Sequence, residues 1–218
     1  MGQFKHLKIG ANRASSYALF ELSTLDLVLR EFAVMVQVMW PAVPMSLILL
    51  HLFIGFWRRV GRPSYLILFF LWVPIGYVLS LHSDALLWMG FPESLAVRAV
   101  GLALIVLAVV LHAWTADLLG LKATLGLAEL DPVDVKRPLV TSGPFGVVRH
   151  PSYLAHTMFL LGTFLVAGYL AIGVIVVLDL LLTYFVTIPL EERELLKRYG
   201  AEYQAYRKTV PKLLPTRL

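Results

Sequence analysis

The sequence predicts an all-α, polytopic membrane protein with about five transmembrane helices. Of its 218 residues, 59% are hydrophobic and only 15% are charged, and the mean hydropathy is +0.77. Soluble domains are nearer half apolar and a quarter charged, so this chain is too apolar for a water-facing surface. The apolar runs are continuous rather than alternating, which argues against a β-barrel. Helices remain, because they satisfy their own backbone hydrogen bonds within hydrocarbon.

The first part of the chain divides into a mixed segment and two apolar spans. Residues 1–31 interleave charged and apolar side chains, a pattern typical of a helix lying at the membrane interface. Apolar spans follow at about 32–57 and 64–81. Pro41 and Pro44 are expected to kink the first span, because proline lacks the backbone N–H that a continuous helix needs.

The second part of the chain holds a third apolar span, at about 95–116, and then a much longer one. Residues 153–188 form a mainly apolar run of 36 positions in which Asp179 is the only Asp, Glu, Lys or Arg. A straight helix of that length would measure about 54 Å, far more than a hydrocarbon core of about 30 Å. The sequence therefore predicts a helical hairpin that turns near Gly168.

The tail from 191 to 208 predicts a C-terminal cytosolic amphipathic helix. Acidic residues fill its first turn, where Glu194 is expected to be solvated, and Leu and Tyr residues recur at helical spacing behind them. Three regions are thus expected: an N-terminal interfacial segment at 1–31, the first two transmembrane helices at 32–94, and a core of third helix, loop, hairpin and C-terminal helix at 95–218.

The distribution of positive charge predicts the topology. Fourteen of the 19 Lys and Arg residues lie in the loops at 58–62 and 117–152 or after residue 189. With five spans these regions share one side, which the positive-inside rule places in the cytosol. We expect a multi-pass protein of a cell inner membrane or the ER membrane, with membrane lipids as partners. No basic cluster is dense enough for nucleic acid, no metal-ligand spacing occurs, and the sequence carries no signal for oligomeric state.

The longest loop ends in a pattern suited to binding an anion. Gly143-Pro144 marks a turn, and Arg149-His150-Pro151 follows at the mouth of the fourth helix. Proline suits a first helical turn because its missing N–H costs no hydrogen bond there. The free N–H groups of that turn, with Arg149 and His150, form a candidate carboxylate or phosphate site. Alternatively, the two side chains only anchor the helix among the lipid headgroups.

Several motifs occur in order after residue 95. They are Leu139-Val-Thr-Ser-Gly-Pro-Phe145, Arg149-His-Pro-Ser-Tyr153, a helical hairpin, Glu191-Glu192 and Gly200-Ala-Glu-Tyr-Gln-Ala-Tyr206. With this set, residues 95–218 resemble the isoprenylcysteine carboxyl methyltransferase family, whose wider group includes phospholipid N-methyltransferases. The resemblance implies an integral-membrane methyltransferase that uses S-adenosyl-L-methionine on the cytosolic side. Its acceptor would be lipophilic, either isoprenylcysteine carboxylate-like or another lipid or small hydrophobic molecule.

The resemblance also implies roles for single residues. Arg149 and Glu192 fall on positions that face the acceptor and are the candidate catalytic residues. The charge of Glu191 and the nearby aromatic rings suit the cationic end of the cofactor. The cofactor-contacting positions are Leu139, Val140, Phe145, His150, Pro151, Ser152, Tyr153 and Glu191.

One departure from the family concerns the acceptor. Prenylcysteine enzymes commonly carry an Arg about one helical turn before the acidic pair, whereas this chain has Tyr184, Phe185, Thr187 and Ile188 there. The difference argues against prenylcysteine itself. It favours another lipophilic acceptor, such as a phospholipid amine, a phenol, a thiol or a free carboxylate.

Polar residues at membrane depth form a second candidate site. Asp179 falls near the middle of the fifth helix, where a charge is costly and by default functional. Its expected partner across the hairpin is His156, with His112 as the alternative. The pair is either structural or part of the acceptor site. His51 is expected to be a packing or interfacial histidine.

Two other functions remain compatible with the sequence. Sterol reductases, which use NADPH, have a similar C-terminal His-Pro and Tyr-Gly pattern, although they generally have more spans. A membrane protein that keeps the fold without turnover is the other alternative. Binding of S-adenosylhomocysteine or of NADPH distinguishes the three.

Overall fold

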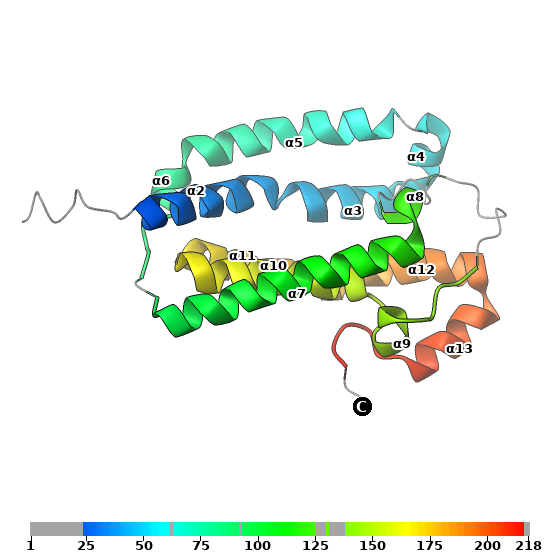
Figure 1. The fold of residues 1–218 in the computed structure, drawn as a ribbon. Helices are drawn as coiled ribbons and strands as arrows, with labels where there is room; N and C mark the ends of the chain where they lie inside the picture. The colour runs from blue at the N-terminus through cyan, green and yellow to red at the C-terminus, as the bar shows by residue number, and fades with distance from the viewer. Residues whose placement is uncertain (1–23, 62, 92, 125–129, 131–137, 216–218) are drawn as a thin grey trace, which may run out of the picture.

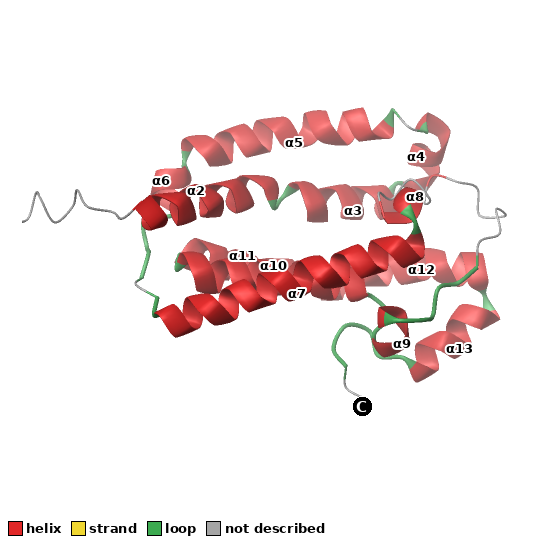
Figure 2. Cartoon of the chain, viewed as in Figure 1, coloured by secondary structure: helices red, strands yellow, loops and turns green. Residues whose placement is uncertain are grey.

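The computed structural model describes residues 24–61, 63–91, 93–124, 130 and 138–215. Within these residues the elements are helices and no strand occurs (Figures 1 and 2), as the all-α prediction required. The predicted interfacial segment lies outside the described residues except for 24–31, which open the first described helix. In chain order the helices are α2 (Thr24–Met39), α3 (Ala42–Leu52), α4 (Ile54–Val60), α5 (Ser64–Leu81), α6 (Ser83–Leu86), α7 (Leu95–Leu119), α8 (Leu121–Thr124), α9 (Pro144–Val147), α10 (Pro151–Ala167), α11 (Leu170–Leu182), the π-helical turn η2 (Thr183–Thr187), α12 (Ile188–Tyr199) and α13 (Ala201–Thr209).

The predicted first span consists of two helices that meet at Pro41. α2 and α3 follow each other with a break at Trp40 and Pro41 (Figure 1), so the kink predicted at Pro41 is confirmed. Pro44 makes no break of its own, because it lies in the first turn of α3, where N–H groups have no helical partner. The described part of this helix already includes residues 24–31, whereas the apolar span was expected to begin at about residue 32.

The predicted hairpin is present and turns at the predicted glycine. α10 ends at Ala167, and Gly168 adopts a left-handed conformation with φ 70° and ψ 29°. A Cβ on Gly168 would also come within 2.5 Å of the carbonyl oxygen of Phe91. Backbone hydrogen bonds from Phe91 N to Gly168 O (2.9 Å) and from Leu170 N to Met89 O (3.0 Å) hold the turn against the preceding connection.

α10 lies against α7 at a glycine crossing. A Cβ on Gly162 would lie 2.6 Å from the carbonyl oxygen of Gly101, and a Cβ on Gly101 would lie 2.8 Å from that of Gly162. Small residues at such a crossing let two backbones approach closely inside a membrane. Nearer the start of α10, Ser152 donates a hydrogen bond to the hydroxyl of Thr115 on α7, 3.1 Å away. This seam fixes the position of the motif-bearing end of α10.

The predicted fifth helix and the first half of the predicted C-terminal helix form one rod, Leu170–Tyr199, whereas the second half lies in α13. α11 passes through η2 into α12 without interruption, so no separate helix begins at Glu191. The π turn η2 ends two residues before Pro189. A proline ring crowds the carbonyl group one turn earlier in a helix, and the wider π turn changes the backbone hydrogen-bond pattern at this point. The rod ends at Gly200, with φ 55°, and α13 leaves in a new direction.

Within the part of the chain that the structure describes, three helical segments are long and apolar enough to cross a membrane: Thr24–Leu52, Leu95–Leu119 and Leu170–Tyr199. Two further apolar helices, Leu66–Leu81 and Pro151–Ala167, are shorter. These segments coincide with the five expected spans, although only three reach spanning length. The outer faces of α5 and α7 expose large apolar side chains along their lengths, a surface suited to lipid. The chain is a membrane protein.

The two ends of the helical bundle carry different elements. At one end, Arg98 of α7 pairs with Asp26 of α2 at 3.3 Å. At the other end lie α4, α8, α9, α12 and α13 (Figure 1). α4, α9 and α12 border or belong to the three basic regions, so these regions meet at one end, as the charge pattern predicted.

Candidate functional site

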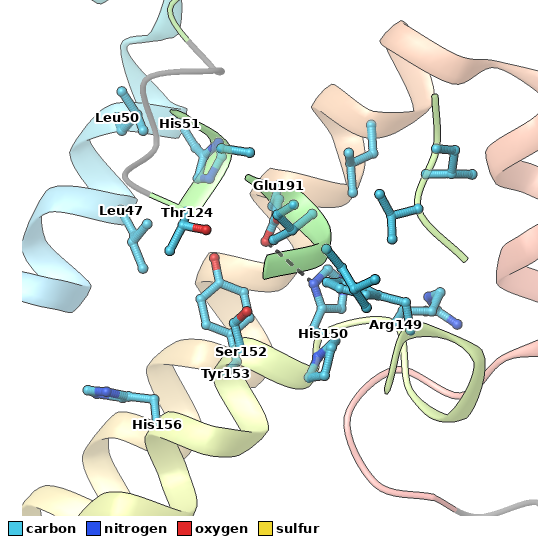
Figure 3. A pocket seen from close by; sticks show the side chains of 18 of the residues that line it. Leu47, Leu50, His51, Thr124, Arg149, His150, Ser152, Tyr153, His156 and Glu191 are labelled. Atoms are coloured by element: carbon cyan, nitrogen blue, oxygen red, sulfur yellow. Dashed lines mark ion pairs between the residues drawn. The ribbon is translucent and has the colours of Figure 1, made fainter. Parts of the chain in front are cut away.

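A cavity of about 770 Å³ lies between α3, α7, α10 and α12, at the basic end of the bundle (Figure 3). Its wall is mainly apolar, and its polar groups gather around the start of α10. The sequence assigned eight cofactor-contacting residues to three separate segments, and the structure brings all of them to this cavity. They are Leu139, Val140, Phe145, His150, Pro151, Ser152, Tyr153 and Glu191.

The loop before α10 is held by the tyrosines of α13. Phe145 is buried, and its carbonyl oxygen accepts a hydrogen bond from the Tyr206 hydroxyl at 2.6 Å. Burial, partly offset by the Arg149 guanidinium, raises the pKa of Tyr206 to about 12, so the phenol stays a donor. Burial and the carboxylate of Glu192 likewise raise the pKa of Tyr203, whose ring lies beside that of Tyr206. Two tyrosines of the predicted Leu and Tyr stripe, Tyr203 and Tyr206, therefore support the loop before α10.

His150 sits between two carboxylates of α12. Its Nδ1 lies 3.4 Å from Oε2 of Glu191 (dashed in Figure 3), and its Nε2 lies 3.3 Å from Oε1 of Glu192. The ring stacks on Tyr153, with centroids 5.7 Å apart. Burial by itself would lower the pKa of His150, but the two carboxylates outweigh it and raise that pKa above its ordinary value of 6.5. The protonated form therefore persists to higher pH than in a free histidine.

Arg149 holds the C-terminal segment in place. Its Nε and Nη2 donate to Oε1 of Glu192 at 3.0 and 2.7 Å, and its Nη1 donates to the carbonyl oxygens of Arg207 and Val210. Its backbone N–H donates to the carbonyl oxygen of Pro211 at 2.8 Å. Arg149 lines the cavity, whereas Glu192 is not among the described residues that do so. That either residue faces the acceptor stays a prediction.

His51 is a cavity residue that the sequence did not reveal. Instead of a packing or interfacial position, it lines the cavity and is 8% exposed, and its Nδ1 has no hydrogen-bond partner among the described residues. Figure 3 shows it on α3, on the side toward Glu191. Spacing in the sequence held no signal for this placement, because α3 is uniformly apolar and lies outside the motif set.

Glu194 also differs from its expectation. A solvated position at a helix start was predicted for it, but the structure buries it to 6% exposure. Its carboxylate lies 2.6 Å from Nζ of Lys197 and 3.4 Å from Nη2 of Arg58. Arg58 comes from the end of α4, so this ion pair joins the N-terminal helices to the helix that carries Glu191.

The polar residues predicted at membrane depth meet each other. Oδ1 of Asp179 accepts a hydrogen bond from Nε1 of Trp40 at 2.8 Å and lies 3.3 Å from Nε2 of His156. Asp179 thus pairs with His156, as expected, and His112 lines the cavity instead. Asp179 is 1% exposed, whereas His156 lines the cavity. The carboxylate therefore touches the cavity only through the imidazole, and a role in acceptor binding stays a prediction.

Comparison with protein families identifies the segment that builds this cavity. Residues 96–202 match the family described as phospholipid methyltransferase. The match covers α7, the loop, α10 to α12 and the start of α13, whereas α3 with His51 lies outside it. No solved structure matches the chain at a significant level.

Two curated relatives share parts of the chain. Protein-S-isoprenylcysteine O-methyltransferase of Schizosaccharomyces pombe is 36% identical over 77 residues, which are 35% of this chain and 33% of that protein. Methanethiol S-methyltransferase 1 of Bradyrhizobium diazoefficiens is 34% identical over 108 residues, which are 49% of this chain and 33% of that protein. The chain thus spans about a third of the length of the curated relatives it matches. Residues 96–202 are therefore similar to membrane methyltransferases of the phospholipid and isoprenylcysteine methyltransferase type.

Proposed function

We propose that the protein transfers a methyl group from S-adenosyl-L-methionine to a lipophilic acceptor. One observation carries this proposal: eight residues from three distant segments, each assigned to the cofactor by its motif position, line a single cavity. The named relatives methylate different acceptors, an isoprenylcysteine and methanethiol, so methyl transfer is what they share.

The polar end of the cavity, formed by His150, Ser152, Tyr153 and Glu191, fits the charged groups of this cofactor. Oε2 of Glu191 lies 3.4 Å from Nδ1 of His150 but makes no hydrogen bond among the described residues, and it suits an ammonium group. The rings of Phe145 and Tyr153 suit a sulfonium through cation–π attraction. His150, which stays protonated to higher pH, and the N–H groups that open α10 suit a carboxylate. The bound cofactor would supply an electrophilic methyl group.

The protein's own task is then alignment, because methyl transfer is an in-line displacement. The Arg149–Glu192 pair holds His150 on one side and the segment after α13 on the other. Both side chains are engaged by these contacts, so we assign them a positioning role at the polar end. Tyr206 does the same for Phe145.

The acceptor is expected to enter from the bilayer. Much of the remaining cavity wall consists of apolar residues of α3 and α7, such as Leu47, Leu50 and Leu119, and the outer face of α7 is apolar as well. The basic regions gathered at this end favour the cytosolic side of an inner or ER membrane. The cofactor would then come from the cytosol and the acceptor from the lipid.

The test is calorimetric titration of the protein in nanodiscs with S-adenosylhomocysteine. We expect binding, and we expect Glu191→Ala to weaken it by about 10- to 100-fold, since a hydrogen bond to a charged group contributes roughly 1.5–3 kcal/mol. Glu202→Ala, an exposed carboxylate on α13, is the matched control and should bind normally. Binding of NADPH without binding of S-adenosylhomocysteine would instead assign the protein to the reductases. Binding of neither molecule would overturn the proposal.

A further inference from the structure

The cavity continues from its polar end toward the membrane centre. His156 lies six residues after His150 on α10, which at 1.5 Å per residue is about 9 Å along the helix. Figure 3 shows its side chain below Tyr153, away from the His150–Glu191 pair. Ala42 and Ser46, in the first turns of α3, line the cavity too. We call this region, His156 with Ala42 and Ser46, the deep end.

The surroundings of His156 orient its ring. Nε2 is buried and lies 3.3 Å from Oδ1 of Asp179, an ion-pair separation without hydrogen-bond geometry, and the same oxygen accepts a hydrogen bond from Nε1 of Trp40 at 2.8 Å. The His156 side chain is 24% exposed, against 2% for that of Asp179. No hydrogen bond or ion pair engages Nδ1 of His156 among the described residues. The ring thus turns one nitrogen to a fixed carboxylate and leaves the other for a molecule in the cavity.

If the His156–Asp179 pair had only a structural role, it would be energetically costly at this depth. A carboxylate inside a membrane is costly, and Oδ2 of Asp179 has no hydrogen-bond partner among the described residues. Apolar side chains of similar volume often pack as stably as a buried ion pair. A carboxylate that fixes the tautomer of a histidine whose other nitrogen is open is, however, the arrangement by which proteins build a proton acceptor.

We propose that His156, oriented by Asp179, accepts the proton of the methyl acceptor, whose reacting group is therefore a protic nucleophile such as a thiol, an amine or a phenol. This inference rests on the proposed function and deepens it. Nδ1 of His156 takes the proton as the X–H bond of the acceptor breaks. The freed electron pair of X bonds to the methyl carbon, while the donor sulfur keeps the pair of the broken carbon–sulfur bond. Asp179 neutralises the imidazolium until its proton passes to water at product release.

Other titratable groups share the cavity with His156. His51 on α3, His112 on α7 and Tyr153 on α10 line it, and the charged Arg149, Glu191 and Arg198 come from the loop and from α12. The turn after α2 presents Trp40, which does not titrate, and α11 presents Asp179. A pH effect assigned to His156 must therefore vanish in a variant of that residue alone.

The experiment uses the protein in nanodiscs, a labelled methyl donor and two probes of different chemistry. Decanethiol carries a proton on its reacting atom, whereas N-acetyl-S-farnesylcysteine presents a carboxylate that is already ionised. We expect His156→Gln to lower transfer to decanethiol by about 100-fold or more and to abolish the rise of the rate with pH. Asp179→Asn should act in the same direction, because its amide favours the wrong tautomer. Any transfer to the farnesylated probe should be insensitive to both variants.

Two controls separate this role from a structural one. S-adenosylhomocysteine affinity should stay within about twofold in both variants, and His82→Gln, an exposed histidine at the end of α5, should change nothing. Independently of activity, ¹⁵N spectra of histidine-labelled protein should show His156 with its proton on Nε2, and Asp179→Asn should release this tautomer.

The contrary results are equally specific. Loss of S-adenosylhomocysteine binding in proportion to activity, or equal losses with both probes, would make the pair structural and overturn the inference. A protein that binds S-adenosylhomocysteine but transfers nothing to decanethiol would also overturn it, while the proposed function stands. An unaltered protein that does not bind S-adenosylhomocysteine would overturn the proposed function itself.

Discussion

The two ends of the cavity both place a histidine beside a carboxylate, but they surround it differently. At the polar end, His150 contacts Glu191 and Glu192, and Arg149 ties Glu192 to the backbone after α13. At the deep end, the described residues give His156 one carboxylate, which accepts a single hydrogen bond, from Trp40. Many partners hold a charge in place for binding, whereas few partners leave a nitrogen free to gain and lose a proton.

The largest expected effect comes from breaking the densely connected end. Arg149→Ala leaves the buried carboxylate of Glu192 without its main partner and releases the segment after α13. Removing one member of a buried ion pair costs about 3–5 kcal/mol of stability. Thermal unfolding in detergent should show a clearly lowered Tm, whereas the exposed Arg193→Ala should leave it unchanged. Equal Tm values for the two variants would contradict the positioning role of Arg149.

A smaller loss of stability is expected at the deep end. Trp40→Phe keeps the ring but removes the hydrogen bond to Asp179, and a hydrogen bond to a charged group contributes roughly 1.5–3 kcal/mol. The same unfolding measurement should place this variant between Arg149→Ala and the unaltered protein. Trp88→Phe, on an exposed ring, is the control. A loss as large as that of Arg149→Ala would erase the difference between the two ends.

Next in size is the contribution of α3 to the polar end. His51→Leu removes the buried imidazole that has an unpaired Nδ1 in the cavity. We expect S-adenosylhomocysteine affinity to fall by about 5- to 10-fold, because a neutral hydrogen bond contributes roughly 1 kcal/mol. His82→Leu should bind as the unaltered protein does. Unchanged affinity in His51→Leu would show that His51 does not contribute to binding at the polar end of the cavity.

The smallest effect is a pH dependence of binding. The pKa of His150 is raised above 6.5 in the folded protein, so its positive charge is fully present below pH 6.5 and is lost as pH rises through the raised pKa. S-adenosylhomocysteine carries a carboxylate, so its affinity should fall a few-fold as the pH increases through the pKa of His150. Titrations at several pH values should show this trend, and His150→Gln should flatten it. An affinity that increases with pH would contradict the role assigned to His150.

The sequence anticipated those features that depend on neighbours along the chain. The hairpin followed from the length of the apolar run and from Gly168, and the break at Pro41 followed from a missing N–H. The eight cofactor positions followed from a resemblance of motifs, and the structure gathers them in one cavity. Whether they bind the cofactor stays a prediction.

Features that depend on which helices lie side by side were beyond the sequence. His51 and Arg58 come from the apolar N-terminal half, and nothing in their spacing shows that α3 lines the cavity or that α4 reaches Glu194. The continuous rod was missed because the polarity of residues 191–208 suggested a new helix, whereas the backbone passes Pro189 through a π turn. Periodicity reports the faces of one helix, not the partner that covers each face.

The contacts of Arg149 also bear on how the protein is made. Its guanidinium is held by the carbonyl oxygen of Val210, 61 residues later, with the last long apolar helix between the two in the chain. During synthesis the chain emerges from its N-terminus onward, so Arg149 has no such partner until that helix has been translated. The polar end of the cavity therefore closes only after the helix Leu170–Tyr199 has been delivered to the bilayer. A nascent chain stalled before that point would have its helices but not its binding site.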